Sequence, residues 1–188
     1  MVRPLLLMTL LLLTCACTGF REGMPGVFRS SFAREEQMIR RIEQNGIRSV
    51  LCLRGGRTAR QSERATMAGG AEFTSVPISA KSAPRPEALL KLWHVAATAE
   101  RPIMVHCRAG VDRTGLALAI IALHDTGDFE LARDQLAFIP NGHIAAFGTE
   151  AMDRVIDDFE PFHEVLSFPS WVERVYTADY ERNNATPQ

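Results

Sequence analysis

The ten residues 106–115, with the sequence HCRAGVDRTG, constrain this chain more than any other stretch. The apolar run 103–105 before them is short and typical of a buried strand, whereas the Ala- and Leu-rich run 116–121 after them is typical of a buried helix. We therefore expect a tight loop between a strand and the N-terminus of a helix. Such a loop directs backbone N–H groups and the positive end of the helix dipole at an anion.

The residue types in this loop favour nucleophilic chemistry on a bound anion. A cysteine at a helix N-terminus, such as Cys107, has a lowered pKa and becomes a thiolate, which is both a good nucleophile and a good leaving group. Arg113 offers a planar fork of donors that matches two phosphate oxygens. Gly110 permits backbone angles that let several N–H groups converge, and Thr114 can donate a hydroxyl hydrogen bond to the sulfur. The alternative is an ordinary strand-to-helix turn around a buried, inert cysteine.

The loop resembles the signature of the cysteine-dependent protein tyrosine and dual-specificity phosphatases, in which His-Cys is followed after five residues by Arg-Thr. Three earlier pieces, Arg29-Ser30, Gly46-Ile47 and Leu53-Arg54, resemble the opening of the compact bacterial dual-specificity-like group. The resemblance extends over about residues 26–160.

This resemblance implies a phosphomonoester hydrolase that works through a phosphocysteine, with no cofactor and no metal. It assigns catalysis to Cys107, Arg113, Thr114 and an acid, and it gives His106 the supporting role of ordering the loop through hydrogen bonds. The phosphate-binding residues that it implies are Arg108, Ala109, Gly110, Val111 and Arg113.

The general acid is the open question of this site. Phosphatases of this class usually carry an Asp on a mobile loop ahead of the signature, but the corresponding residues 75–88 contain only one acid, Glu87. Glu87 reads best as a carboxylate in the first turn of a helix. Asp112, inside the loop, matches the Asp-Arg variant of the myotubularin lipid phosphatases and of bacterial relatives, and can instead be a residue that holds the loop shape. Both acids stay open, with Asp112 preferred.

Alternating strand and helix patterns, followed by helices alone, predict an α/β fold. We expect a compact cysteine-phosphatase fold, with a mostly parallel sheet of about four to five strands flanked by helices and a helical C-terminal part. The expected strands are 27–28, at an edge, then 49–53, 73–78 and 103–106. The expected helices are 33–45, 62–69, 82–99, 114–125, 129–138, 149–160 and 170–182, the last with a capping box that begins at Ser170.

The N-terminus predicts export. A positive start and an apolar stretch at 5–13 are typical of a signal peptide, and a small residue before Cys17 resembles the bacterial lipoprotein box. We expect a lipoprotein-type signal peptide at 1–16, lipidation of Cys17, and a linker at 17–26. A phosphatase domain at 27–182 and a disordered tail at 183–188 follow. The protein is then exported to the periplasm or held as a lipoprotein in the bacterial cell envelope.

Composition narrows the partners. The 21 Lys and Arg and the 22 Asp and Glu are balanced and form no basic block, so no nucleic acid is expected. The expected partners are a phosphorylated protein or small phosphoester, and a membrane reached through the N-terminal lipid. The alternatives are a phosphoinositide or phospholipid phosphatase, a weak phosphate-binding pseudophosphatase, and sulfur transfer or arsenate reduction, which also use a Cys-to-Arg loop.

Two kinds of residue receive only structural assignments. The histidines outside the loop, namely His94, His124, His143 and His163, show no metal-ligand spacing and are read as structural or surface residues. Cys52 reads as a small core residue, with a protective disulfide to Cys107 as the alternative. The turn at 140–143 is a candidate for the rim of the site, but no pattern in the sequence requires it.

Overall fold

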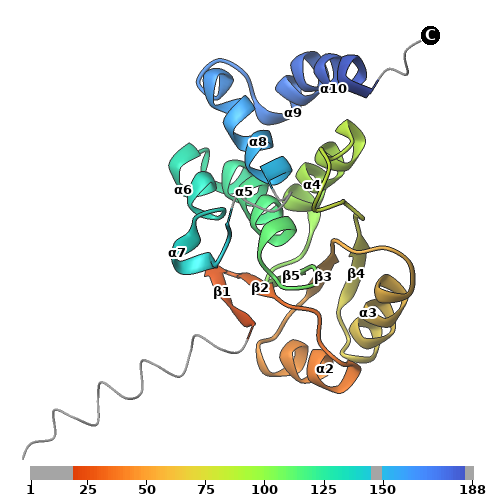
Figure 1. The fold of residues 1–188 in the computed structure, drawn as a ribbon. Helices are drawn as coiled ribbons and strands as arrows, with labels where there is room; N and C mark the ends of the chain where they lie inside the picture. The colour runs from red at the N-terminus through yellow and green to blue at the C-terminus, as the bar shows by residue number, and fades with distance from the viewer. Residues whose placement is uncertain (1–18, 145–149, 185–188) are drawn as a thin grey trace, which may run out of the picture.

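A five-stranded, mostly parallel sheet forms the centre of the computed structural model, which describes residues 19–144 and 150–184 (Figure 1). The strands are β1 (Phe20–Met24), β2 (Val27–Ser30), β3 (Ser49–Cys52), β4 (Glu72–Ser75) and β5 (Ile103–His106). They lie in the order β1-β2-β5-β3-β4, with β1 antiparallel to β2 and every other pair parallel. The strand that leads into the signature loop, β5, is therefore central.

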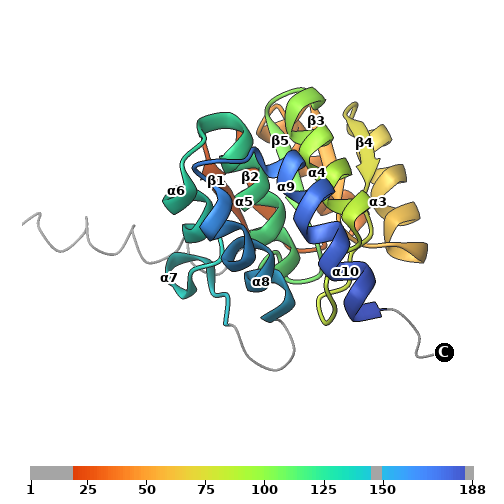
Figure 2. The same cartoon turned by 90° about the horizontal axis from the view of Figure 1, so that it is seen from above.

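Helices cover both faces of the sheet, because successive side chains of a strand point to opposite faces. On β5, Ile103 and Val105 face one core while Met104 faces the other. Helices α2 (Glu35–Gln44) and α3 (Gly56–Ala68) pack on the Met104 side. Helices α4 (Pro86–Thr98) and α5 (Asp112–Thr126) pack on the other side, as Figure 2 shows from above.

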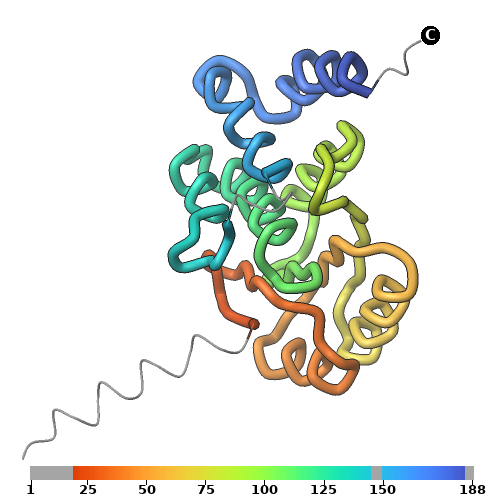
Figure 3. The backbone as a smooth tube through the Cα atoms, in the orientation of Figure 1, coloured from red at the N-terminus to blue at the C-terminus, as the bar shows by residue number. Residues whose placement is uncertain are grey.

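A C-terminal helical layer covers α4 and α5. It comprises α6 (Phe129–Asp134), α7 (Phe138–Asn141), α8 (Glu150–Phe159), a 3-10 turn (Glu160–Phe162), α9 (Phe168–Trp171), a π turn (Val172–Tyr176) and α10 (Thr177–Asn184). Aromatic rings in edge-to-face and tilted contacts, including Phe159, Phe168 and Trp171, fill the space beneath it. The Tyr176 hydroxyl donates a 2.7 Å hydrogen bond to the Pro84 carbonyl and so ties this layer to the segment before α4. The tube in Figure 3 follows this path.

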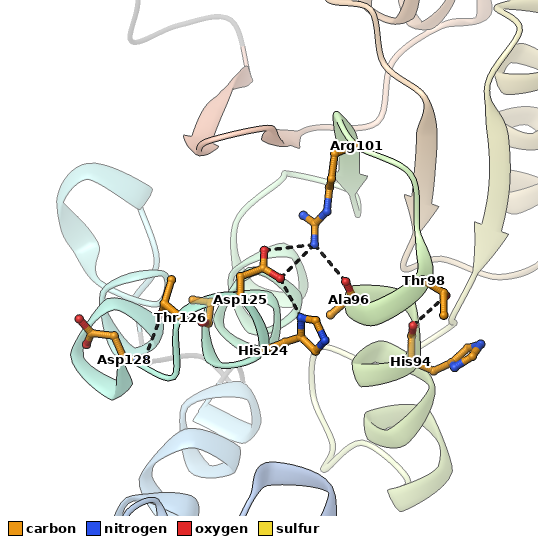
Figure 4. Close-up of polar contacts among 9 residues, drawn as sticks. His94, Ala96, Thr98, Arg101, His124, Asp125, Thr126 and Asp128 are labelled. Atoms are coloured by element: carbon orange, nitrogen blue, oxygen red, sulfur yellow. Dashed lines mark hydrogen bonds and ion pairs between the residues drawn. The ribbon is translucent and has the colours of Figure 1, made fainter.

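A polar cluster fixes the end of α5 that is remote from the signature loop (Figure 4). Arg101, just before β5, donates to the Ala96 carbonyl at 3.2 Å and pairs with Asp125 at 3.2 Å. Asp125 also contacts His124 Nδ1 at 2.8 Å. The cluster joins α4, α5 and the start of β5, so it aligns the strand and the helix that carry the loop.

The structure confirms the predicted fold class, but several boundaries differ. Residues 20–24 form a strand where a linker was expected, because Pro25-Gly26 makes a hairpin turn, with Gly26 at φ +69°, and Phe20 stacks on Phe28 at 5.4 Å. As a result β2 is an interior strand and not an edge.

Three helix starts were also predicted wrongly. Helix α4 begins at Pro86 and not at 82. Helix α3 begins at Gly56 and not at the predicted Ser62, which is buried inside the helix. Ser167, and not Ser170, caps the last helical segment, by accepting from the Ser170 N–H. The helix then runs to Asn184, two residues into the predicted tail.

The predicted signal peptide and the lipidation site Cys17 lie outside the described residues, as does the tail from 185 onwards. Among the described helices, none is both long and apolar enough to cross a membrane.

Candidate active site

The signature loop lies at the carboxyl end of β5, where it turns into the N-terminus of α5 (Figure 1). Cys107 is the first residue after the strand, and it is 2% exposed. The backbone N–H of Gly110 donates to Cys107 Sγ at 3.2 Å. The predicted order of strand, loop and helix is therefore confirmed, and a backbone N–H of the loop is directed at the sulfur.

The loop holds its shape because it presses against the end of β2. Gly110 has φ +77°, a left-handed conformation that favours glycine, and an added Cβ would lie 2.6 Å from the Ser30 carbonyl carbon. The Phe32 N–H donates to the Arg108 carbonyl at 3.1 Å. The Arg29-Ser30 pair that the sequence singled out is thus the support on which the loop rests.

Several groups stabilise the thiolate of Cys107. Burial raises the pKa of this thiol, but the Thr114 hydroxyl, the N–H groups of Gly110 and Val111 and the charge of Arg113 lower it by more, so the pKa lies below its ordinary value. The Thr114 hydroxyl is buried and has no partner of normal hydrogen-bond geometry among the described residues, so it acts on the sulfur without a normal hydrogen bond.

Arg113 lies in the first turn of α5, beside the segment that precedes α4. Its Nη1 donates to the Ile78 carbonyl at 3.4 Å, and its buried Nε has no partner among the described residues. Arg108 and Ala109 are exposed at the tip of the loop, which leaves their side chains facing solvent. Glu87 is exposed in the first turn of α4 and makes no polar contact with the described part of the chain, as the helix-start interpretation expects.

Asp112 is held by a network that reaches well beyond the loop. His143 Nδ1 lies 2.8 Å from Asp112 Oδ1, and His143 Nε2 lies 2.8 Å from Asp153 Oδ2 on α8. His143 as a whole residue is 2% exposed, and its imidazole lies between the two carboxylates. The pKa of His143 is raised above its ordinary value by the hydrogen bond to Asp112, against the effect of burial, and further by Asp153.

His106 is fully buried and neutral. Burial lowers its pKa to about 4, a hydrogen bond to the Cys107 carbonyl opposes the shift, and the charges of Arg41 and Arg54 add to it. Its Nδ1 lies 3.4 Å from the Cys107 carbonyl oxygen, which fits the predicted role of ordering the loop.

Arg29 is a buried cation that the sequence did not assign to the site. Its side chain reaches the Gln135 carbonyl at 3.2 Å, while Nε and Nη1 have no partner within the described residues. Its pKa is lowered to about 10 by burial and by Arg21, and the nearby Cys107 partly offsets this. The charge of Arg29 therefore interacts favourably with a thiolate at Cys107.

Cys52 lies on the neighbouring strand, where it is paired in register with His106. Both Cys52 and Cys107 are free and buried, which agrees with the core-residue interpretation of Cys52. The described residues contain no group of three or more His, Cys, Asp and Glu side chains that could hold a metal.

His143 was assigned a structural or surface role, although the turn that contains it was noted as a possible rim. Asp112 lies 31 positions before His143 in the sequence and Asp153 lies 10 positions after it, so no local spacing could have revealed these contacts. Arg29 was missed for a similar reason, since an Arg on a strand gives no sign that it is buried beside a loop 78 residues later.

The comparisons agree with this geometry. The family model described as polymorphic toxin system, DSP-PTPase phosphatase matches residues 23–127, and the chain belongs to this family. It is a cysteine phosphatase of the dual-specificity and tyrosine type. No curated protein matches the chain.

Solved structures of cysteine phosphatases share the fold. TpbA from P. aeruginosa is 19% identical over 75% of this chain and 84% of that chain, with a TM-score of 0.59. The core catalytic domain of the PP-IP phosphatase SIW14 from S. cerevisiae, in complex with citrate, is 20% identical over 90% and 94%, with a TM-score of 0.58. PTPMT1, in complex with PI(5)P, is 15% identical over 76% and 97%, with a TM-score of 0.54.

Proposed function

We propose that this phosphatase hydrolyses phosphomonoesters in two steps through a phosphocysteine on Cys107. The observation that carries the proposal is the buried sulfur, which accepts the Gly110 N–H at the N-terminus of α5 and has a lowered pKa. In the first step the thiolate attacks phosphorus, the S–P bond forms and the ester O–P bond breaks. Water then attacks phosphorus, and the sulfur departs as thiolate with help from Thr114.

Charge stabilisation supplies most of the catalysis in this scheme. The loop N–H groups and the Arg113 guanidinium bind the equatorial oxygens, where negative charge accumulates in the transition state. Arg113 has the freedom to do so, because the one hydrogen bond that it makes within the described residues is a long one to the Ile78 carbonyl.

The decisive test is Cys107→Ser. The variant should lose turnover of p-nitrophenyl phosphate and still bind vanadate, because the loop donors remain. With labelled substrate, acid-quenched wild-type enzyme should carry phosphate on Cys107, and Cys107→Ser should carry none. Undiminished turnover by Cys107→Ser would overturn the mechanism, and binding without turnover by the wild type would favour a pseudophosphatase.

We assign the general acid to Asp112. It lies within the loop, whereas Glu87 is exposed and makes no polar contact with the loop. Asp112→Asn should slow an alkyl phosphate more than p-nitrophenyl phosphate, because a good leaving group needs less protonation. Wild-type rates on both substrates would remove Asp112 from this role, and Glu87→Gln is the matched variant.

For the substrate we propose a phosphoprotein or a simple phosphoester. The loop carries one extra cation, Arg108, and also an acid, Asp112, so a highly charged head group would gain little there. A phosphoinositide or phospholipid is the second candidate, favoured by the likeness in fold to PTPMT1. Phosphate release from phosphotyrosine, phosphoserine and lipid phosphates distinguishes the two.

We also propose that the protein is exported and lipidated on Cys17. The support is the sequence of residues 1–17, with a positive start, an apolar stretch and Ala16 before Cys17. Mass spectrometry of the mature N-terminus from a membrane fraction tests this. An unmodified N-terminus that begins at residue 1 would contradict it, and Cys17→Ser should release the protein from membranes.

A further inference from the structure

The buried histidine next to the catalytic loop has both ring nitrogens occupied by carboxylates. Asp112 Oδ1 lies 2.8 Å from Nδ1, and Asp153 approaches Nε2 at 2.8 and 3.0 Å through its two oxygens. The three groups come from α5, from the residues just after α7 and from α8. The His143 side chain is 1% exposed, whereas Asp112 and Asp153 retain 27% and 21% exposure.

We propose that His143 and Asp153 are a positioning pair that holds Asp112 and stores the proton that Asp112 delivers to the leaving oxygen. The inference rests on the proposed function, in which Asp112 is the general acid. It assigns a role in the phosphatase reaction to two residues outside the signature loop.

Proton counting on the three groups supports the stored proton. A neutral imidazole has one N–H, so with two ionised carboxylates one of its nitrogens would face an oxygen with no proton between them. Both short contacts form only if the network carries one additional proton, either as imidazolium or as a protonated carboxyl. Because the flanking carboxylates raise the pKa of His143 despite burial, that proton is retained above the usual range of a histidine.

The proton has a balanced path through the reaction. As the ester O–P bond breaks, the proton that Asp112 shares with Nδ1 passes through the Asp112 carboxyl group to the leaving oxygen. This transfer makes His143 neutral and leaves Asp112 ionised. In the second step the attacking water bonds to phosphorus and gives a proton to Asp112, which restores the shared proton on the network. No external acid or base is consumed, and Asp153 keeps its charge throughout.

Two carboxylates favour the protonated form of His143, and of these Asp153 lies outside the signature loop. Within the described residues, Asp112 and Asp153 are the charged groups that contact His143, and the charged side chains on the surrounding elements contact other groups. These are Arg113 on α5, Asp157 on α8, Arg133 on α6 with its partners Asp157 and Glu160, and Arg21 on β1, which binds Asn141. A change in the charge at position 153 therefore acts on the reaction through His143.

The sharpest test is Asp153→Asn, with Asp158→Asn on the same helix as the matched control. The asparagine oxygen still accepts from Nε2–H, but the negative charge is lost, so His143 releases its proton at lower pH. We expect the basic limb of the kcat profile for an alkyl phosphate to move to lower pH, with kcat reduced several-fold at neutral pH and KM unchanged. The turnover of p-nitrophenyl phosphate should fall less, and Asp158→Asn should match the wild type.

A second variant separates proton storage from simple support of the fold. His143→Ala removes the imidazole from a buried site, and added imidazole should restore part of the turnover of the alkyl phosphate. A residue that only braces the loop would give no such rescue. If His143→Ala does not fold, the pH profile of Asp153→Asn decides the matter by itself, after thermal denaturation and vanadate binding have shown that the variant is folded.

The outcomes separate this inference from the proposed function. If Cys107→Ser is inactive and phosphocysteine is trapped, but Asp153→Asn keeps the wild-type pH profile and leaving-group dependence, the positioning pair is wrong and the mechanism stands. If Cys107→Ser retains turnover, the proposed function itself is wrong.

Discussion

Single residues prepare the proposed nucleophile as much through backbone geometry as through charge. Gly110 combines a left-handed conformation with a contact against the Ser30 backbone, and its N–H then points at Cys107 Sγ. Arg29 adds a buried positive charge from the strand below. The thiolate thus depends on two groups from neighbouring parts of the fold, the loop after β5 and the strand β2.

Gly110→Ala should disrupt this arrangement. The left-handed conformation costs about 1–2 kcal/mol for a residue with a Cβ, and the contact with the Ser30 carbonyl carbon cannot be relieved by moving a side chain. We expect a loss of stability of at least this size and at least a tenfold fall in turnover. Gly127→Ala, at the other end of α5, has φ +69° with no atom within 4 Å of the added Cβ. Gly127→Ala should lose stability but keep its turnover. Equal losses of turnover in the two variants would show that the contact of Gly110 with Ser30 does not shape the site.

Arg29→Met should raise the pKa of Cys107, because it removes a nearby positive charge and retains most of the buried volume. The pH dependence of Cys107 alkylation by iodoacetamide measures the shift directly. Arg48→Met, which removes an exposed arginine paired with Glu100, is the control. An alkylation profile in Arg29→Met identical to that of the wild type would show that this charge does not act on the sulfur.

At the scale of elements, a strand, a loop and a helix could be predicted from sequence, because the apolar runs at 103–105 and 116–121 have distinct lengths and compositions. The hairpin of β1 and β2 could not be, since its Gly and Pro residues are equally typical of a linker. The network of Asp112, His143 and Asp153 depends on how α7 and α8 pack against α5, which is decided by tertiary contacts and not by local pattern.

Tyr176→Phe tests how the C-terminal layer supports the segment before α4. The variant leaves the buried Pro84 carbonyl without its 2.7 Å hydrogen bond, which costs about 1–3 kcal/mol. For a domain of this size each kcal/mol lowers Tm by about 2–4 °C. Thermal denaturation measures the loss. Tyr180→Phe removes a hydroxyl that makes no hydrogen bond to a described residue, and it should leave Tm close to the wild-type value.

For the whole molecule, buried histidines make stability depend on pH. The pKa of His106 is about 4 in the folded state against an ordinary value of 6.5, so the unfolded chain binds more protons between these two values. The contribution of His106 to stability is complete above pH 6.5 and is lost progressively as the pH falls towards 4. His143 has the opposite sign: its raised pKa favours the folded state at low pH, and this contribution is lost as the pH rises through the folded pKa.

His106→Asn should therefore flatten the acid side of the stability profile. A pKa difference from 6.5 to about 4 corresponds to about 3 kcal/mol in the free energy of unfolding across that window. Urea unfolding of wild type and variant at a series of pH values measures the difference in slope. The exposed His94→Asn is the control. Parallel profiles for wild type and His106→Asn would mean that His106 is not the group responsible.

The direction of β1 bears on where this enzyme would meet its substrates. Because β1 runs antiparallel to β2, Phe20 pairs with Ser30, and the described chain begins at the same edge of the sheet as Cys107. Cys17 is two residues before Gly19, a span of at most about 7 Å. Phe20 lies two strand spacings from His106, so a lipid on that cysteine would hold the catalytic end of the sheet within about two nanometres of its membrane. The surface density of a membrane-bound substrate, and not its bulk concentration, would then set the rate of encounter.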